Sequence, residues 1–106
     1  MIKVKIKEQS FLARIAAMKL KCNSAAIVFG TTIHLWNVSR KNFLENERWL
    51  LHELQHIRQY KKLGYTSFLF QYLSESIRNG YYKNRFEVEA RHAEFKKESY
   101  NDFVFL

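Results

Sequence analysis

The chain has 106 residues, of which 47% are hydrophobic and 16% aromatic, so it is long enough for one domain and too apolar for a disordered segment. Its single cysteine excludes an intramolecular disulfide and a zinc site built from several cysteines. The formal net charge of +8 favours acidic substrates or polyanionic surfaces and also suits simple solubility. No stretch approaches the roughly 18 consecutive apolar residues of a membrane-spanning helix, and the lysine-rich N-terminus differs from a secretory signal. We therefore expect a single soluble domain, residues 1–106, in the cytoplasm and without a membrane partner.

The N-terminal segment, residues 2–7, alternates apolar residues with lysines. A period of two residues is typical of a strand that buries one face, so we expect a strand with a lysine-rich outer face. The next segment, residues 11–20, repeats apolar residues at helical spacing, and Ser10 before it can cap a helix through its side-chain oxygen. The expected buried stripe of this helix consists of Phe11, Leu12, Ile15 and Met18.

A β-hairpin is predicted next. Two short runs rich in apolar and β-branched residues, Ala25–Phe29 and Thr32–Trp36, are separated by Gly30 and Thr31, a pair that suits a turn. The first strand, the helix and the strand at residues 25–29 have the order of a β-α-β unit. Such a unit makes a right-handed crossover between parallel strands, so we expect these two strands to run parallel.

The second half of the chain is predicted to be helical. Three segments repeat apolar residues at spacings of three and four. They are residues 40–63, ended by Gly64; residues 68–78, capped by Thr66 or Ser67; and residues 85–98, capped by Asn84. Together with the first strand and the hairpin, they predict an α+β fold that has a small three-stranded sheet and about four helices.

Residues 52–56 read His-Glu-Leu-Gln-His and lie within the strongest predicted helix. Residues four apart lie on the same face of a helix, so His52 and His56 can direct neutral imidazole nitrogens at one zinc ion. Glu53 is about 100° further round the helix, which makes it a poor third ligand. It is placed instead beside a metal-bound water, whose proton it can accept as a general base.

The neighbours of this motif are uncharged, as a buried metal-binding helix requires. They are Trp49, Leu50, Leu51, Leu54, Gln55 and Ile57. The alternative interpretation is an ordinary pair of histidines with a glutamate nearby in a hydrogen bond. A catalytic zinc site also needs a third protein ligand. The downstream candidates are Glu75, Glu87, Glu89, His92, Glu94 and Glu98.

The motif at residues 52–56, followed by Asn-Arg-Phe-Glu-Val-Glu-Ala-Arg at residues 84–91, resembles the gluzincins, a group of zinc metallopeptidases. Size and layout are most similar to the minigluzincins, soluble relatives of the catalytic domains of CAAX-processing membrane proteases. The downstream block is also similar to the peptidase-like core domain of contractile injection systems. The resemblance covers residues 40–98 well and the N-terminal part more loosely. It implies a zincin-like fold, a Zn²⁺ cofactor, hydrolysis of a peptide or protein substrate, and Glu87 as the zinc ligand that joins the two histidines.

The downstream block differs from the gluzincin pattern at one position and leaves another open. Relatives carry an Asp where this chain has Arg91, and that Asp orients a zinc-binding histidine, so the orienting group must come from elsewhere here. Glu89 remains the alternative ligand, because Glu87 and Glu89 face opposite sides of a helix and only one can point inward. The candidates for stabilising an oxyanion are Arg91, His92, Tyr81 and Tyr82.

Further expectations follow from the resemblance. An edge strand of these enzymes pairs with extended substrate, and residues 32–36 are the candidate strand. Minigluzincins resemble self-inhibited precursors, so the apolar tail at residues 101–106 is expected either to fill the substrate groove or to form a short strand or a packed end. The competing functions are a basic non-catalytic module that binds nucleic acid or protein, and a zinc-binding pseudo-peptidase. We do not expect a nucleic-acid partner, and the sequence leaves the oligomeric state, the substrate and the activity of the chain open.

Overall fold

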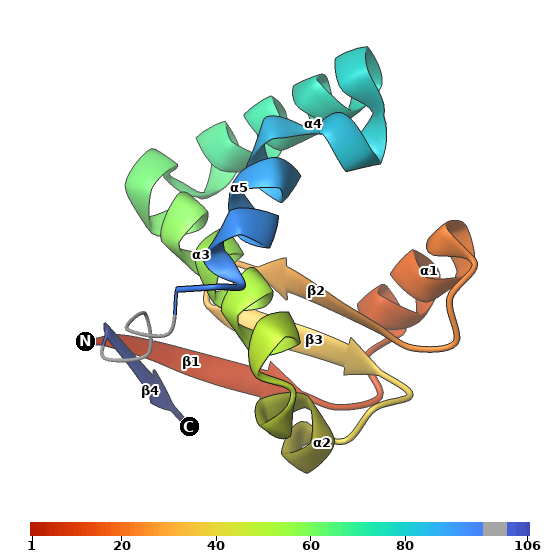
Figure 1. The fold of residues 1–106 in the computed structure, drawn as a ribbon, viewed down its shortest axis with the longest axis vertical. Coiled ribbons are helices and arrows are strands. Elements are labelled where there is room, and N and C mark those ends of the chain that lie inside the picture. Colours follow the sequence, from red (N-terminus) through yellow and green to blue (C-terminus); the bar gives the residue numbers. More distant parts are fainter. Residues whose placement is uncertain (97–101) are drawn as a thin grey trace.

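Residues 1–96 and 102–106 are described by a computed structural model, where they form one mixed four-stranded sheet and five helices (Figure 1). The expected α+β class is correct, although the sheet has one strand and the chain one helix more than predicted. In chain order the elements are β1 (Ile2–Lys7), α1 (Phe11–Leu20), β2 (Ala25–Phe29), β3 (Thr32–Trp36), α2 (Arg40–Glu45), α3 (Glu47–Leu63), α4 (Tyr65–Lys83), α5 (Arg85–Ala93) and β4 (Phe103–Phe105). Within these described ranges, none of the helices combines the length and the apolar composition needed to cross a membrane.

The strand order in the sheet is β2-β3-β1-β4, so β2 and β4 are its two edges. β2 and β3 form the predicted antiparallel hairpin, in which Phe29 lies opposite Thr32, and β1 lies parallel to β3. The expectation that β1 and β2 run parallel is wrong, because β3 lies between them and β2 runs in the opposite direction. The register shows that the chain re-enters the sheet at Ala25, opposite Trp36 and near the end of β1, and that β2 runs back from there.

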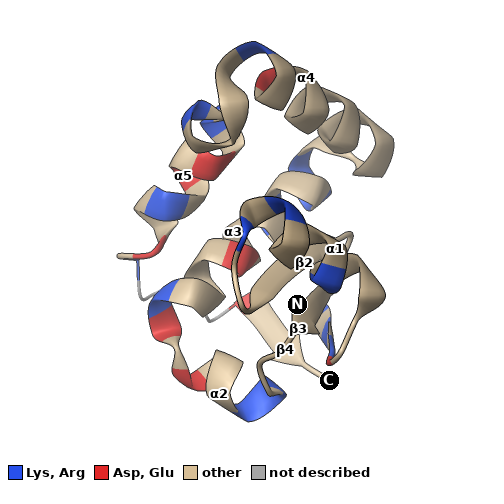
Figure 2. Cartoon of the chain, turned by 90° about the vertical axis from the view of Figure 1, so that its right-hand side faces the viewer, with Lys and Arg blue, Asp and Glu red and all other residues tan. Residues whose placement is uncertain are grey.

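Helix α1 forms over the predicted residues but presents a different face to the sheet. Its buried residues are Ala13 and Ala17, whereas Phe11 and Met18 are each 69% exposed. Small alanine side chains let the helix lie close to β2 and β3, which stand behind it in Figure 2. The predicted burial of the larger apolar stripe is therefore wrong.

The hydrophobic core lies between α3 and one face of the sheet (Figure 1). Leu50, Leu54 and Ile57 of α3 are each buried in this core. The sheet contributes Val4, Val28, Ile33, Leu35 and Phe103. From α4 and α5 come Phe68 and Phe86, whose rings meet edge to face with centroids 5.1 Å apart. The aromatic contact joins α4 and α5 to the layer that α3 forms on the sheet.

Two predicted helix starts differ from the structure. Residues 40–63 form two helices rather than one, because the side chain of Asn46 accepts a hydrogen bond from the backbone N–H of Trp49 and caps a new helix there. Ser10, expected to cap α1, instead places its hydroxyl oxygen 2.8 Å from Nδ1 of His34 on β3. A contact distant in sequence thus replaces the local cap.

The two C-terminal helices agree with the sequence more closely. α4 begins upstream of Thr66 and Ser67, so neither residue caps it, and Gly80 with a φ of 80° kinks it near its expected end. Asn84 caps α5 as predicted, by accepting a hydrogen bond from the backbone N–H of Phe86. α5 is shorter than predicted. The capped start of α5 matters most for the site, because the first turn of this helix carries Glu87.

The C-terminal residues Phe103–Phe105 form β4, a strand that pairs in parallel with β1. Phe103 lies opposite Ile2, and its side chain is buried in the core. Of the two expectations for the tail, the short strand is correct for these residues. β4 and β2 lie at opposite edges of the sheet. Asn101, the first residue of the tail expected to act as an inhibitor, lies outside the described residues.

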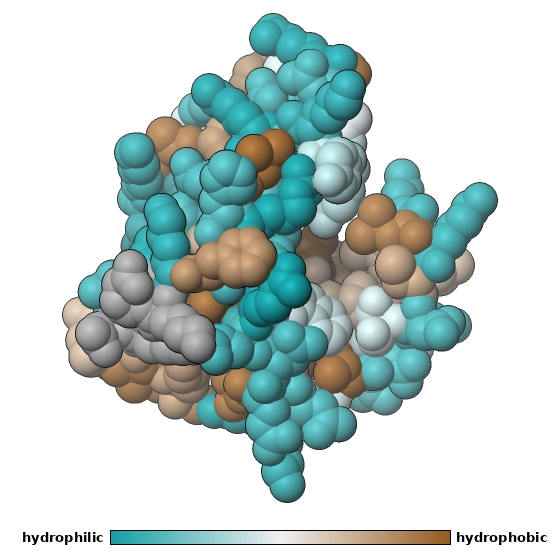
Figure 3. All heavy atoms as spheres, viewed as in Figure 1, coloured by the Kyte–Doolittle hydropathy of each residue, from teal (hydrophilic) through white to brown (hydrophobic). Residues whose placement is uncertain are grey.

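A cleft of about 440 Å³ opens between the edge strand β2 and the first half of α3. Figure 3 shows the surface hollowed between the α1 side and the α4 side of the molecule. The cleft is lined by Ser24, Ala25 and Ala26 beside β2, by Trp49, His52 and Glu53 of α3, and by Tyr81 of α4, among others. The predicted catalytic helix therefore forms one wall of the cleft, and an unpaired strand edge forms the other.

Replacing Phe103 by alanine should lower the free energy of unfolding by about 3 kcal/mol, because it removes a buried ring from the core. The matched control is Val104→Ala on the same strand, which shortens an exposed side chain and should cost less than about 1 kcal/mol. Urea denaturation followed by circular dichroism measures both values. Equal losses in the two variants would contradict the place of β4 in the sheet.

Candidate metal centre

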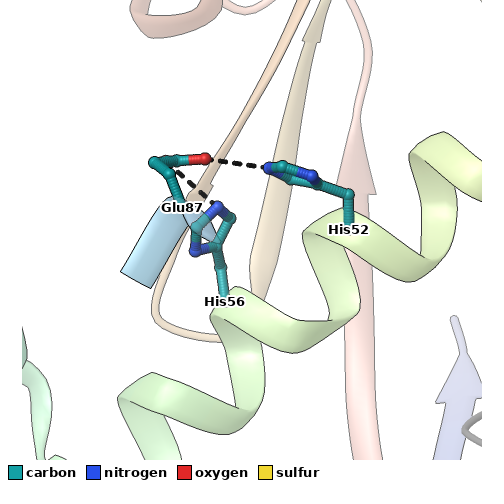
Figure 4. Close-up of side chains that lie close together, drawn as sticks. All are labelled: His52, His56 and Glu87. Atoms are coloured by element: carbon teal, nitrogen blue, oxygen red, sulfur yellow. Dashed lines mark hydrogen bonds and ion pairs between the residues drawn. The ribbon is translucent and has the colours of Figure 1, made fainter. Parts of the chain in front are cut away.

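His52 and His56 stand one turn apart on α3 and direct their rings toward the same point (Figure 4). They lie on the side of α3 opposite the core residues Leu50 and Leu54, and their ring centroids are 5.1 Å apart. α5 covers this side of α3. Because of that cover, His56 is buried and His52 is half-buried, although neither belongs to the apolar core.

Glu87 reaches both histidines from the first turn of α5. Its Oε1 lies 2.9 Å from Nε2 of His52, and its Oε2 lies 3.2 Å from Nε2 of His56. The hydroxyl of Tyr72 on α4 donates a hydrogen bond to the same carboxylate. Ala90, one turn further along α5, is fully buried and small, which lets α5 approach α3 closely. Three helices thus converge on one carboxylate.

The two histidines and Glu87 are a chemically suitable set for a zinc ion. One donor atom from each lies within 4.8 Å of the others. Two imidazole nitrogens and one carboxylate oxygen are ligands that catalytic zinc sites use, with the fourth position left open. Donor atoms bound to one zinc ion at about 2.1 Å are roughly 3.4 Å apart, which is close to the separations found between the carboxylate and each ring. The residues therefore fit a zinc ion by their chemistry, and their donor atoms lie close enough together to share one.

Glu53 follows His52 on α3 and is only 5% exposed, yet it lines the cleft beside that histidine. Burial raises the pKa of its carboxyl to about 7, although the neighbouring imidazoles favour the charged form. A carboxyl group whose pKa lies near neutrality can both take up and release a proton. Its position and its pKa thus suit a general base that later acts as a general acid.

Glu87 carries the negative charge that holds the cluster together. Burial alone would raise the pKa of its carboxyl, but hydrogen bonds from His52 and His56 outweigh burial and hold that pKa well below its usual range. For His52, burial lowers the pKa, but the hydrogen bond to Glu87 and the charge of Glu53 raise it to about 9. Protons on the imidazoles therefore balance the carboxylate, and a metal ion has to displace them.

Each histidine is also held through its other ring nitrogen. Nδ1 of His52 lies 2.8 Å from Oε2 of Glu94, and Nδ1 of His56 lies 2.8 Å from Oε1 of Gln59. Glu94 thus offers His52 the carboxylate that Asp provides in the gluzincin pattern, whereas the sequence predicted Glu94 only as a candidate ligand. A signal was present: Glu94 is seven residues after Glu87, so two helical turns place both on one face.

The structure separates the other acidic candidates from the cluster. Glu89 accepts hydrogen bonds from the side-chain amides of Gln55 and Gln59. It lies on the opposite side of α5 from Glu87. Glu75 accepts a hydrogen bond from the backbone at the start of α5. Glu98 lies outside the described residues. Neither Glu89 nor Glu75 contacts the two histidines as Glu87 does.

Of the four candidates for stabilising an oxyanion, Tyr81 lines the cleft. Arg91 donates a hydrogen bond to the backbone carbonyl of Tyr82, and its guanidinium lies 4.2 Å from the centre of the Tyr82 ring. His92 lines a separate hollow of about 410 Å³ beside α5. Burial and the charge of Glu87 raise the pKa of Tyr81, so its hydroxyl keeps its proton and remains a hydrogen-bond donor.

Comparisons with protein-family profiles, with curated proteins and with solved structures found no match for this chain. The chemistry of the site therefore has to be inferred from its own atoms. Two imidazoles, one buried carboxylate and a further acid beside an open cleft form an arrangement suited to metal-assisted hydrolysis.

The protein should bind one zinc ion per chain, and His56→Ala should weaken zinc binding by more than about 100-fold, because losing a ligand costs more than losing an outer hydrogen-bond partner. His92→Ala is the matched control, since it removes a histidine that lies outside the cluster. Competition with a chromogenic chelator measures both affinities. Wild-type zinc affinity in His56→Ala would contradict the site.

Glu94→Gln should weaken zinc binding by roughly 10-fold or more, because it removes the negative charge that orients His52 and makes its ring a stronger ligand. The control is Glu45→Gln, the same exchange at an exposed position on α2. The same chelator competition gives the affinities, and thermal unfolding shows whether both variants keep the fold. An affinity equal to that of the control would show that Glu94 does not orient the ligand.

Proposed function

We propose that this chain is a zinc-dependent metallopeptidase with a zincin-like fold of the gluzincin type. The observation that supports this most strongly is the convergence of His52, His56 and Glu87 next to Glu53, a buried acid that lines an open cleft. The resemblance of the two sequence motifs to the gluzincins supports the same assignment.

The proposed reaction divides the work between the cluster and Glu53. A zinc ion held by His52, His56 and Glu87 would act as a Lewis acid toward the peptide carbonyl and would make water easier to deprotonate. Glu53 accepts the proton of the attacking water as a general base. It then donates this proton to the nitrogen of the leaving amine, so that the carbon–nitrogen bond breaks without forming a free amide anion.

Residues around the cluster fix its geometry and complete the cleft. Glu94 and Gln59 bond the outer nitrogens of the two imidazoles and so keep their inner nitrogens directed at the ligand position. Tyr81 reaches the cleft from α4 and donates a hydrogen bond to the negative charge that develops on the substrate carbonyl oxygen.

The extended substrate enters along the free edge of β2. The sequence-based expectation of residues 32–36 is wrong, because β3 is paired on both sides and has no free edge. β2 is an edge strand, and its residues Ala25 and Ala26 line the cleft. Their small side chains leave room for a peptide backbone to pair with the strand by main-chain hydrogen bonds.

Two rival functions predict different results. A zinc-binding pseudo-peptidase would hold one zinc ion without hydrolysing peptides, whereas a basic non-catalytic module would bind polyanions in a salt-dependent way without zinc. Self-inhibition by the tail is not part of the proposal, because Phe103–Phe105 occupies the sheet edge opposite β2.

Glu53→Gln should reduce hydrolysis of a fluorescence-quenched peptide library by about 10²- to 10⁴-fold, because an amide cannot accept the proton of water. Zinc content should stay unchanged, since Glu53 lies outside the group of suitable ligands. Glu45→Gln is the control for the same chemical exchange at an exposed position.

The outcomes separate the three functions. Hydrolysis by the wild type that Glu53→Gln abolishes without loss of zinc supports the peptidase. A zinc-loaded wild type that cleaves no member of the library indicates the pseudo-peptidase. Full activity in Glu53→Gln would contradict the proposed role of this residue.

A further inference from the structure

The outer face of α1 carries large apolar side chains that are exposed to solvent among the described residues. Phe11 and Met18 are each 69% exposed, and Leu12 and Ile15 are also exposed. These residues lie opposite the alanine side of α1, which contacts the sheet. Lys19 lies among them, and Arg14 lies at their border on the side toward Trp36. We call this set the α1 face: Phe11, Leu12, Arg14, Ile15, Met18 and Lys19.

The sheet surface beside α1 has the same character. The guanidinium of Arg14 lies 5.2 Å from the centre of the Trp36 ring, so α1 rests on the side of the sheet to which Trp36 points. Strand alternation and register place Ile27, Phe29 and Lys7 on this side as well. All three are exposed. Apolar and basic side chains thus continue from the α1 face onto the sheet.

The net charge of the protein is concentrated in this half of the chain. Residues 1–44 contain eight basic residues and one acidic residue, Glu8, whereas residues 45–106 contain ten basic and nine acidic residues. α1 and the four strands contain no Asp or Glu, and α1 in Figure 2 carries blue segments without red. Such a surface attracts anions and repels a second copy of itself.

We propose that the α1 face docks on the surface of an anionic lipid bilayer. A helix that presents large apolar side chains together with basic residues resembles the membrane-facing part of helices that bind the membrane interface. The basic residues pair with anionic headgroups while the apolar side chains enter the boundary with the acyl chains. Nucleic acid fits less well, because its phosphates offer no apolar environment to the mostly aliphatic stripe. The proposal is independent of the proposed peptidase activity, and it differs from the expectation of no membrane partner, which rests on the lack of a spanning segment.

Co-sedimentation of the full chain with vesicles tests this proposal. The protein should bind vesicles of phosphatidylcholine and phosphatidylserine in equal amounts at least about tenfold more tightly than vesicles of phosphatidylcholine alone, and added salt should weaken the binding. The double variant Phe11→Ser with Met18→Ser should lose at least about tenfold in affinity. Its control is Phe70→Ser with Ile77→Ser on α4, where the side chains are 77% and 86% exposed and binding should not change.

A second pair of variants tests the charge. Arg14→Gln with Lys19→Gln should weaken binding by roughly tenfold or more, whereas Lys61→Gln with Lys62→Gln at the end of α3 should leave it unchanged. Circular dichroism and thermal unfolding verify that each variant is folded. Equal loss in the α4 control, or absence of binding to both vesicles, would overturn the proposal. So would tighter binding to a single-stranded oligonucleotide, or a dimer that the α1 variants dissolve.

Discussion

The carboxylate of Glu87 is the contact on which the site and the docking of α5 both depend. It joins α5 to α3 through two imidazoles and to α4 through the hydroxyl of Tyr72. A buried carboxylate is costly unless positive charge lies close to it, so Glu87 requires either protonated histidines or a cation at the same place. The fold therefore buries a carboxylate that needs a positive charge beside it. A divalent cation would supply that charge while both imidazoles stay neutral.

The surroundings of this carboxylate form a connected polar layer beneath α5. His56 bonds Gln59, and Gln59 in turn donates hydrogen bonds to the backbone carbonyl of Phe86 and to Glu89. On the other side, His52 bonds Glu94, which also pairs with Arg48 at 3.3 Å. A protein selected for stability alone gains more from apolar side chains at such positions. The polar layer is instead what a site needs if its rings must hold one orientation.

Local patterns in the sequence were sufficient where the deciding interaction is itself local. The hairpin follows from two runs of apolar and β-branched residues around Gly30, where a φ of 67° suits glycine. The Asn84 cap and the one-turn spacing of His52 and His56 are likewise readable within a few residues. These features need no knowledge of how the elements pack.

Features that depend on how the helices and strands pack could not be predicted from local sequence patterns. The buried side of α1 was predicted from the larger apolar residues, but the sheet accepts the narrow alanine side and leaves the larger residues to solvent. The direction of β2 depends on where the chain re-enters the sheet. The role of Glu94 and the inward direction of Glu87 rather than Glu89 depend on how α5 lies across α3, which the helical pattern alone leaves open.

The zinc K-edge X-ray absorption spectrum of the zinc-loaded protein tests the central claim most directly, because it reports the atoms that surround the ion. The account predicts two imidazole nitrogens and light oxygen ligands at about 2.0–2.2 Å, with the multiple scattering that imidazole rings produce. A sulfur neighbour at about 2.3 Å, or a shell of oxygen without imidazole scattering, would contradict a centre built from His52, His56 and Glu87.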